Sequence, residues 1–400
     1  MKILMINKFL HPAGGAETYV FALGQCLEKL GHEVQYFGME NEKRICGNQK
    51  NLYTSPVDFH HAGRGEKLRY PFRIIYSKEA KQKMEILLQD FCPDIIHLNN
   101  FNYQLTPSVL EAAIEWRKKV PQTKIVLTAH DVQLFCPNHM MYRWKDKEVC
   151  EKCLDEKYHY CIQGRCIHHS FLRSTIGALE AWYWHKRKIY DHFDIIISPS
   201  QFLKKFFDQK EGLRDKTIVM QNFIGEYTPH DYETENYVLY FGRYSEEKGL
   251  ENLLHVCKEL QDIPFVFAGK GPMEEMVSSI SNIKNVGFQS GEELEKLIGK
   301  ARFTICPSIC YENCPFSVIE SIIHHTPVLG ADIGGIPELL HQETAGKLFR
   351  SGDEKDLADA IRTLWEDDEA ILRYKEGCKK VCFSSVREYA KRLLEIYDKE

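Results

Sequence analysis

Residues 237–259 read YVLYFGRYSEEKGLENLLHVCKE, and this pattern recurs along the whole chain. An apolar run, Tyr237–Gly242, is followed by a polar turn with glycine and then by an amphipathic stretch, Glu246–Glu259. The apolar run does not alternate with polar residues, which is typical of a strand covered on both faces. Such strands alternating with helices predict βαβ units and a parallel sheet.

The pattern predicts more strands than one small sheet would hold. The predicted strands are Lys2–Asn7, Glu33–Phe37, Asp94–Asn99, Lys124–His130, Asp194–Ser200, Thr217–Gln221, Tyr237–Gly242, Pro264–Gly269, Arg302–Pro307 and Pro327–Gly330. The predicted helices include Ala16–Leu30, Thr106–Lys118, Glu246–Glu259, Glu292–Gly299 and Asp356–Glu366. We therefore expect an α/β protein with two doubly wound, Rossmann-like domains that face each other across a cleft.

The domain boundary is expected in the polar stretch Asn222–Asn236. We assign residues 1–222 to an N-terminal domain that carries a cysteine-rich insert, 136–169, and residues 223–385 to a C-terminal domain. Residues 386–400 are expected to form a helix that packs back on the N-terminal domain. Ligands of open α/β sheets bind at the carboxyl ends of the strands, so the loops after the strands should line the cleft.

The composition excludes several classes of protein. The chain has 400 residues, a formal net charge of -5 and a pI near 6.4, which argues against bulk nucleic-acid binding. No apolar run approaches the roughly 18–20 residues that cross a bilayer. The first residues lack the small-residue cleavage site of a signal peptide. We expect a cytoplasmic protein.

Three loops after predicted strands have residues suited to an anion. Gly14-Gly15 precede a helix, where backbone amides can face a phosphate, although a plain tight turn is the alternative. Arg243 and Lys248 flank a helix start, where cations are unfavourable unless an anion is bound; a solvated, charged helix start is the alternative. Gly269-Lys270-Gly271 lets a ligand approach the main chain, or forms a bare loop.

The most specific pattern is Glu312-x7-Glu320, which follows the predicted strand Arg302–Pro307. Pro315 marks the start of a helix from about Ser317, so Glu312 lies on the loop and Glu320 on the helix. Amides at a helix start suit phosphate, and carboxylates suit polyol hydroxyls. The pattern predicts a nucleotide sugar, with its diphosphate on the amides and its hydroxyls on the two acids.

Together with Thr128-Ala129-His130-Asp131 and Gly334-Gly335-Ile336-Pro337-Glu338, these motifs resemble the family 4 glycosyltransferases, retaining enzymes of the GT-B fold. The resemblance runs from Lys2 to about Tyr389. It implies an N-terminal acceptor-binding domain and a C-terminal nucleotide-sugar-binding domain. The implied activity is transfer of a sugar, with retention, from a UDP- or GDP-sugar to a glycan or a polyprenyl-diphosphate-linked acceptor. Such enzymes act in surface polysaccharide biosynthesis.

The resemblance also implies roles for individual residues. Arg243 and Lys248 match the pair that holds the donor diphosphate, and Glu312 matches the acid at the donor sugar. Glu320 matches the acid on the ribose diol, and His130 matches a histidine that contacts the transferred sugar. Catalytic roles are thus implied for Glu312, His130, Arg243 and Lys248, and donor-binding roles for Gly15, Gly269, Gly271, Phe316, Ser317 and Glu320.

Two departures from the family pattern concern the donor site. Pro315-Phe316 stand where the family commonly has Phe-Gly, and Ser321–His325 replace a stretch of small residues. The donor sugar is therefore not predicted. No metal or cofactor is expected to be required for catalysis. The alternative functions are a GT-B nucleotide-sugar epimerase and a non-catalytic nucleotide-sugar-binding protein.

The insert contains an unusual concentration of cysteines. Cys150, Cys153, Cys161 and Cys166 have the spacing CxxC-x7-C-x4-C, and Cys136 precedes them. Four thiolates can hold a structural zinc ion, which would order a loop too long for a compact domain. Free thiols in a reduced loop, or a disulfide pair, are the alternatives. Because the insert follows His130, it is expected on the acceptor side.

Basic and aromatic residues gather at two places in the N-terminal half. The first group comprises Arg64, Lys67, Arg69, Tyr70, Phe72, Arg73, Tyr76, Lys78, Lys81 and Lys83, and the second is Trp182–Lys188. Such surfaces suit anionic lipid heads and lipid-linked acceptors. Solvated helix faces are the alternative. We expect peripheral contact with the inner face of a membrane.

Overall fold

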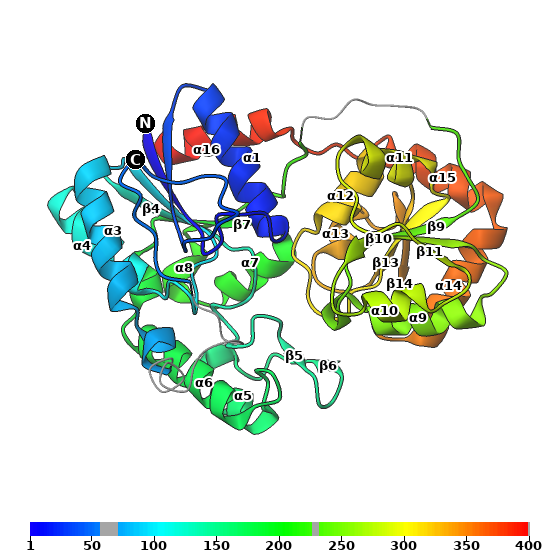
Figure 1. The fold of residues 1–400 in the computed structure, drawn as a ribbon, viewed down its shortest axis with the longest axis horizontal. Coiled ribbons are helices and arrows are strands. Elements are labelled where there is room, and N and C mark those ends of the chain that lie inside the picture. Colours follow the sequence, from blue (N-terminus) through cyan, green and yellow to red (C-terminus); the bar gives the residue numbers. More distant parts are fainter. Residues whose placement is uncertain (57–70, 226–231, 399–400) are drawn as a thin grey trace. The chain divides into compact units, whose positions relative to one another are not determined.

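The computed structural model describes residues 1–56, 71–225 and 232–398. The chain divides into two compact units, the first formed by Met1–Phe223 with Ser385–Glu400 and the second by Ile224–Ser384. Each unit contains a six-stranded parallel sheet with helices packed against it (Figure 1). The prediction of two doubly wound α/β domains is confirmed. Arg64, Lys67, Arg69 and Tyr70 of the first basic group lie outside the described residues.

The sheet of the first unit has the order β2-β1-β3-β4-β7-β8. Its strands are β1 (Lys2–Ile6), β2 (Glu33–Phe37), β3 (Ile95–Leu98), β4 (Lys124–Thr128), β7 (Ile195–Ser198) and β8 (Thr217–Val219). The central strand β1 pairs with β2 on one side and with β3 on the other. Its residues 3–6 are completely buried, which explains their unbroken apolar run. The strand order therefore reverses between β1 and β3.

Helices and a small hairpin complete the first unit. The helices are α1 (Gly15–Lys29), α3 (Lys78–Phe91), α4 (Ser108–Lys119), α5 (His159–Gly164), α6 (Phe171–Lys186), α7 (Gln201–Asp208), α8 (Glu211–Arg214) and α16 (Val386–Asp398), with 3-10 turns η1 (Leu154–Glu156) and η2 (Ile189–His192). The hairpin pairs β5 (Tyr142–Arg143) with β6 (Glu148–Val149). Among helices of the described residues, none is both long and apolar enough to cross a membrane.

The last helix, α16, lies against the first, α1, from the opposite end of the sequence (Figure 1). The Tyr389 hydroxyl shares a hydrogen bond of 2.9 Å with the Tyr19 hydroxyl. The Tyr397 hydroxyl and His97 Nδ1 are 2.5 Å apart, and both side chains are buried. Buried polar groups of this kind are costly to leave unpaired, so α16 is part of the core of the first unit.

The sheet of the second unit has the order β11-β10-β9-β12-β13-β14. Its strands are β9 (Val238–Arg243), β10 (Phe265–Lys270), β11 (Ile283–Asn285), β12 (Phe303–Cys306), β13 (Val328–Ala331) and β14 (Gly346–Phe349). Numbered along the chain, this is the order 3-2-1-4-5-6 of dinucleotide-binding sheets. The order reverses between β9 and β12.

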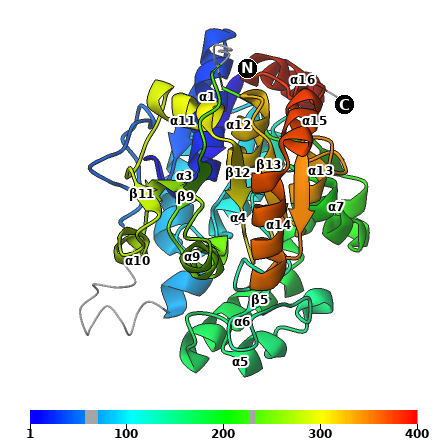
Figure 2. The ribbon, with the colours of Figure 1, turned by 90° about the vertical axis from the view of Figure 1, so that its right-hand side faces the viewer.

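The helices of the second unit are α9 (Leu250–Glu259), α10 (Glu274–Ser278), α11 (Glu292–Lys300), α12 (Phe316–Ile323), α13 (Ile336–Leu339), α14 (Glu354–Glu366) and α15 (Asp368–Cys378). Helices α9 and α14 lie side by side (Figure 2). The predicted helix Glu246–Glu259 was wrong as a single element. A 3-10 turn, η3 (Glu246–Lys248), ends at Gly249, which has φ 70°. A Cβ there would lie 1.9 Å from the Pro307 carbonyl oxygen, so the chain requires glycine.

Candidate functional site

The point where the second sheet reverses its strand order carries an ion pair. Lys248 comes from the segment after β9 and Glu312 from the loop after β12, and Lys248 Nζ lies 2.5 Å from Glu312 Oε1. The Ser308 hydroxyl donates to the same carboxylate oxygen at 2.8 Å. Open α/β sheets bind ligands at the carboxyl ends of the strands at such a reversal. Two residues predicted from separate motifs therefore meet where a ligand is expected.

Lys248 keeps its positive charge in this position. Burial alone would lower its pKa, but the charge of Glu312 and the hydrogen bond to it raise the pKa overall. The Lys248 side chain remains 34% exposed, against 16% for Glu312. The carboxylate therefore holds the ammonium group, while part of the Lys248 side chain stays exposed.

Arg243 is the last residue of β9 and is exposed. Its carbonyl accepts a hydrogen bond of 2.7 Å from the Tyr240 hydroxyl, and in the sheet it stands opposite Lys270 of β10. Within the described parts of the chain, no carboxylate forms an ion pair with its guanidinium group. Arg243 thus adds a second accessible cation at the carboxyl edge of β9.

Two glycines at the end of β10 allow the backbone there to pack closely against the end of β9. A Cβ on Gly269 would lie 1.9 Å from the Gly242 carbonyl oxygen. Gly271 has φ 159°, and a Cβ there would lie 2.3 Å from the Tyr244 carbonyl oxygen. Both glycines are thus needed to hold the loop after β10 against the loop that carries Arg243.

The loop after β13 holds the backbone of Glu312 in the same way. Gly334 has φ 62°, and a Cβ there would lie 2.2 Å from the Glu312 carbonyl oxygen. The amide of Gly335 donates to that oxygen at 2.6 Å. The loops after β9, β10, β12 and β13 therefore pack into one scaffold around Lys248 and Glu312.

Helix α12 begins immediately after this scaffold. Pro315 is its N-cap, and Phe316 and Ser317 are its first two residues. Glu320 lies one turn further on and is half-buried. Burial raises the pKa of Glu320 to about 7, and the charge of Glu295 on α11 acts in the same direction. Glu320 therefore titrates near neutral pH.

His130 follows β4 in the first unit. Its Nε2 atom lies 3.0 Å from Asn99 Oδ1, and its ring meets the edge of the Tyr19 ring, with centroids 4.9 Å apart. Burial lowers the pKa of His130 to about 4, against the smaller opposing effect of Asp131. The imidazole is therefore neutral at physiological pH and acts through hydrogen bonds rather than charge.

Gly15 starts α1 beside a set of polar residues that sequence reasoning missed. Glu17 is buried and accepts a hydrogen bond of 2.9 Å from the Asn7 amide. Burial lowers the pKa of Lys8, and the charges of Asp131 and Glu17 oppose that shift. The position of Asn7 and Lys8 directly after a buried strand was the available signal. Glu17, inside an amphipathic helix, offered none.

The cysteine insert forms two thiol pairs. The Cys136 thiol donates a hydrogen bond of 3.0 Å to Asn138 Oδ1. The neighbouring Cys153 raises the pKa of Cys136, and Cys166 raises the pKa of Cys161. Cys150 stands outside these pairs and is half-buried. Among the residues the structure describes, no three or more His, Cys, Asp or Glu side chains are grouped to hold a metal ion. A zinc ion on Cys150, Cys153, Cys161 and Cys166 stays a prediction.

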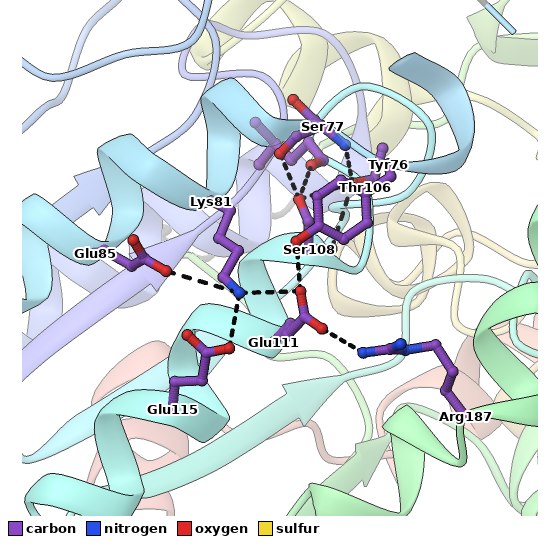
Figure 3. A network of polar contacts seen from close by, with 10 residues as sticks. Tyr76, Ser77, Lys81, Glu85, Thr106, Ser108, Glu111, Glu115 and Arg187 are labelled. Carbon is purple, nitrogen blue, oxygen red and sulfur yellow. Dashed lines mark hydrogen bonds and ion pairs between the residues drawn. The ribbon is translucent and has the colours of Figure 1, made fainter. Parts of the chain in front are cut away.

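Cations of the first basic group are engaged in ion pairs. Lys81 lies 2.7 Å from Glu115 and 3.2 Å from Glu111, which also accepts a hydrogen bond from the Tyr76 hydroxyl (Figure 3). Arg187 of the second group pairs with the same Glu111. This network joins α3, α4 and the end of α6. Lys81 and Arg187 therefore hold these three helices together and do not form a free basic patch.

Known families account for almost the whole chain. The pattern of Glycosyltransferase Family 4 matches residues 13–225, and that of Glycosyl transferases group 1 matches residues 229–381. The first match alone spans more than half of the chain. The protein belongs to glycosyltransferase family 4.

Individual relatives are distant. An uncharacterized 42.6 kDa protein in the cps region of Klebsiella pneumoniae is 22% identical, over 85% of this chain and 87% of its own length. Alpha-D-kanosaminyltransferase of Streptomyces kanamyceticus is 29% identical over 35% of this chain, and O-antigen chain mannosyltransferase C of Escherichia coli is 25% identical over 46%. The chain spans only 39% and 52% of the lengths of the latter two.

Solved structures establish the fold. Sucrose-phosphate synthase of Thermosynechococcus elongatus superposes with a TM-score of 0.70 at 16% identity, covering 99% of this chain and 98% of its own. Anabaena HepE in complex with UDP-glucose superposes with a TM-score of 0.66 at 15% identity, covering 99% and 100%. The chain has the GT-B fold, as its sequence predicts.

Proposed function

We propose that the protein is a retaining glycosyltransferase that moves a sugar from a nucleoside-diphosphate sugar to a hydroxyl group of a glycan or polyprenyl-diphosphate-linked acceptor. The observation that carries this proposal is the pairing of Lys248 with Glu312 beside the accessible Arg243, at the strand reversal of the second sheet. Two cations suit a diphosphate, and a carboxylate suits sugar hydroxyls.

In the proposed reaction the bond between the anomeric carbon and the diphosphate oxygen breaks. A bond from the acceptor oxygen to that carbon forms on the same face of the sugar. The acceptor proton passes to an oxygen of the departing diphosphate, so no protein carboxylate has to attack the sugar. Arg243, Lys248 and the amides at the start of α12 offset the charge that grows on the leaving group.

The remaining residues orient the donor. Glu312, held by Lys248 and Ser308, faces the hydroxyls near the reacting carbon in this proposal, and Glu320 binds the ribose diol. His130 is neutral and can hydrogen-bond the transferred sugar.

Comparisons favour a nucleotide-sugar donor and a polysaccharide acceptor. HepE was crystallised with UDP-glucose, and the E. coli relative is an O-antigen chain mannosyltransferase. We propose a UDP- or GDP-sugar as donor, a role in surface polysaccharide biosynthesis, and action in the cytoplasm at the inner face of a membrane.

A ligand screen tests the donor, and product stereochemistry tests the mechanism. Thermal unfolding should be measured with UDP-, GDP- and ADP-sugars. A donor at 100 times its dissociation constant stabilises the fold by about 2.7 kcal/mol. Proton NMR of the product should then show the anomeric configuration of the donor. An inverted product would contradict retention, and conversion of the nucleotide sugar to an epimer without acceptor would show an epimerase instead.

A further inference from the structure

Helix α6 carries apolar side chains on its outer face. Leu172 is 65% exposed, Leu179 is 49% exposed and Trp182 is 54% exposed. Their spacing of seven and then three residues places them on one stripe of the helix. The opposite face is buried and includes Gly177, Ala181 and Trp184. We call the stripe Leu172, Leu179 and Trp182, with the exposed Phe171 at its start, the α6 face.

The α6 face differs from ordinary surface helices of the same chain. On α14 the exposed residues are Glu354, Lys355, Asp359, Thr363 and Glu366, all polar. The one acid of α6, Glu180, is 3% exposed, and burial raises its pKa to about 8, so it is largely uncharged at neutral pH. The outer surface of α6 is therefore apolar and lacks an exposed carboxylate.

Cations border this face at both ends. Arg165 and Arg173 are exposed near its start, and Lys186 and Lys188 near its end. Residues 165–188 contain five Lys and Arg against one Glu, although the whole chain has a net charge of -5. Arg187 is paired with Glu111, whereas no described carboxylate pairs with Arg173, Lys186 or Lys188. Both views show α6 beside α5 at one end of the first unit (Figures 1 and 2).

We propose that the α6 face docks on the surface of an anionic lipid bilayer, with Trp182, Leu179 and Leu172 in the interfacial layer and the bordering cations on the lipid heads. An amphipathic helix with large apolar residues and flanking cations is suited to lie in such an interface, and tryptophan favours that depth. A bilayer also supplies negative charge to both ends of the helix at once.

A second copy of the chain is a poorer occupant. In a twofold contact the same patch meets itself, so the cations at the ends of one α6 face would meet cations of the other. The exposed surface of α6 offers no carboxylate to compensate them. Charge complementarity therefore favours a lipid surface. This inference extends the proposed function, because a lipid-linked acceptor lies at such a surface, but docking itself needs no transfer reaction.

Vesicle binding of the full chain tests the proposal. The protein should co-sediment with phosphatidylcholine vesicles that contain phosphatidylglycerol, and much less with phosphatidylcholine alone. The double variant Leu179→Ser/Trp182→Ser should reduce the bound fraction by about tenfold or more. Lys186→Glu/Lys188→Glu should remove the preference for anionic vesicles. Leu372→Ser changes an equally exposed leucine of α15 in the second unit (65% exposed) and should leave binding unchanged.

A thermal-shift measurement serves as the control for folding and donor binding. Each variant should retain the thermal shift with the donor nucleotide, so a loss of vesicle binding with that shift intact reports on docking alone. In the wild-type chain, brominated lipids should quench tryptophan fluorescence, and Trp182→Phe should remove most of that quenching. The proposal would be overturned if the wild-type protein did not bind anionic vesicles. It would also be overturned if Leu179→Ser/Trp182→Ser bound them as well as the wild type does. It would also be overturned by a dimer that Leu179→Ser/Trp182→Ser converts to monomer.

Discussion

The carboxyl edges of the two sheets present side chains that differ in charge. In the second unit, the loops after β9 and β12 bring Lys248 against Glu312, with Arg243 nearby. In the first unit, whose strand order reverses between β1 and β3, the neutral His130 after the next strand, β4, lies against the Asn99 amide oxygen after β3. The same architecture thus presents the ion pair Lys248–Glu312 in one unit and a neutral imidazole in the other.

This difference fits the two parts of a transfer reaction. A departing diphosphate gains negative charge in the transition state, so fixed cations stabilise that state more than the ground state. Sugar and acceptor hydroxyls carry no charge and need oriented hydrogen-bond partners. In the first unit, Asp131 and Glu17 lie near enough to Lys8 to shift its pKa. The two acids favour the charged form of Lys8.

Removal of the cations of the second unit should have the largest effect. We expect Arg243→Ala and Lys248→Ala each to lower kcat/KM by roughly two to three powers of ten, as loss of an oxyanion donor does. Lys258→Ala, on the exposed surface of α9, should leave kcat/KM within about twofold, in the range of a surface change. Steady-state kinetics of the three variants, with thermal unfolding as a check on folding, decides. An equal loss of kcat/KM in all three variants would contradict a special role of the two cations at the strand reversal.

The two acids of the second unit should separate binding from turnover. Ribose contacts are alike in the ground and transition states, so Glu320→Ala should mainly raise KM for the donor. Contacts at the reacting sugar change as charge develops, so Glu312→Ala should mainly lower kcat. Initial-rate measurements across donor concentration distinguish the two. Equal effects of both substitutions on KM and kcat would refute this division.

Donor affinity should depend on pH through Glu320. Its pKa of about 7 lies above the ordinary value of 4.5, so Glu320 favours the folded state below pH 4.5, and this contribution is lost as pH rises through 7. Hydrogen bonds from ribose hydroxyls favour the charged carboxylate. Donor affinity should therefore rise by up to about tenfold between pH 6 and pH 8, the effect of one linked proton. His130, with its pKa near 4, does not titrate in this interval.

Isothermal titration calorimetry at pH 6, 7 and 8 measures this dependence. Glu320→Gln cannot ionise and should bind the nucleotide with nearly the same affinity at all three values. A pH slope that persists in Glu320→Gln would assign the titration to another group.

The smallest expected effect is that of chelation. Because Arg243 and Lys248 are expected to offset the diphosphate charge, EDTA should leave transfer unchanged. If the insert binds zinc, metal analysis of the purified protein should find about one zinc per chain, and Cys153→Ser should lose it. Activity lost in EDTA and restored by Mg²⁺ or Mn²⁺ would contradict the first expectation. Zinc well below stoichiometric, with all insert thiols reactive in the folded protein, would contradict the second.

Most of both sheets could be predicted from the sequence, because strands buried on both faces leave unbroken apolar runs such as residues 3–6. Strands β11 and β14 were missed because they are short and partly exposed. In β11 only Ile283 is buried, and in β14 Lys347 and Leu348 are half-buried. Gly249 breaks a helix because the Pro307 carbonyl lies against it, and this contact between distant segments has no local signal.

The candidate site was predictable to a similar degree. The motifs identified Lys248 and Glu312 separately, and the rule that ligands bind at the carboxyl ends of strands placed both near one edge. Their direct contact joins positions 64 residues apart and needed the structure. The buried Glu17 could not be recognised, since charged residues on a helix ordinarily face water.

The most direct test of the account is the affinity of the donor's nucleoside diphosphate for variants of the two units. Calorimetry should compare wild type, Lys248→Ala and His130→Ala, with the nucleotide that the thermal screen selects. We predict that Lys248→Ala weakens binding by about tenfold or more, as loss of a charged hydrogen-bond partner does, while His130→Ala binds like wild type. A loss of affinity in His130→Ala that equals or exceeds the loss in Lys248→Ala would contradict the assignment of the diphosphate to the second unit.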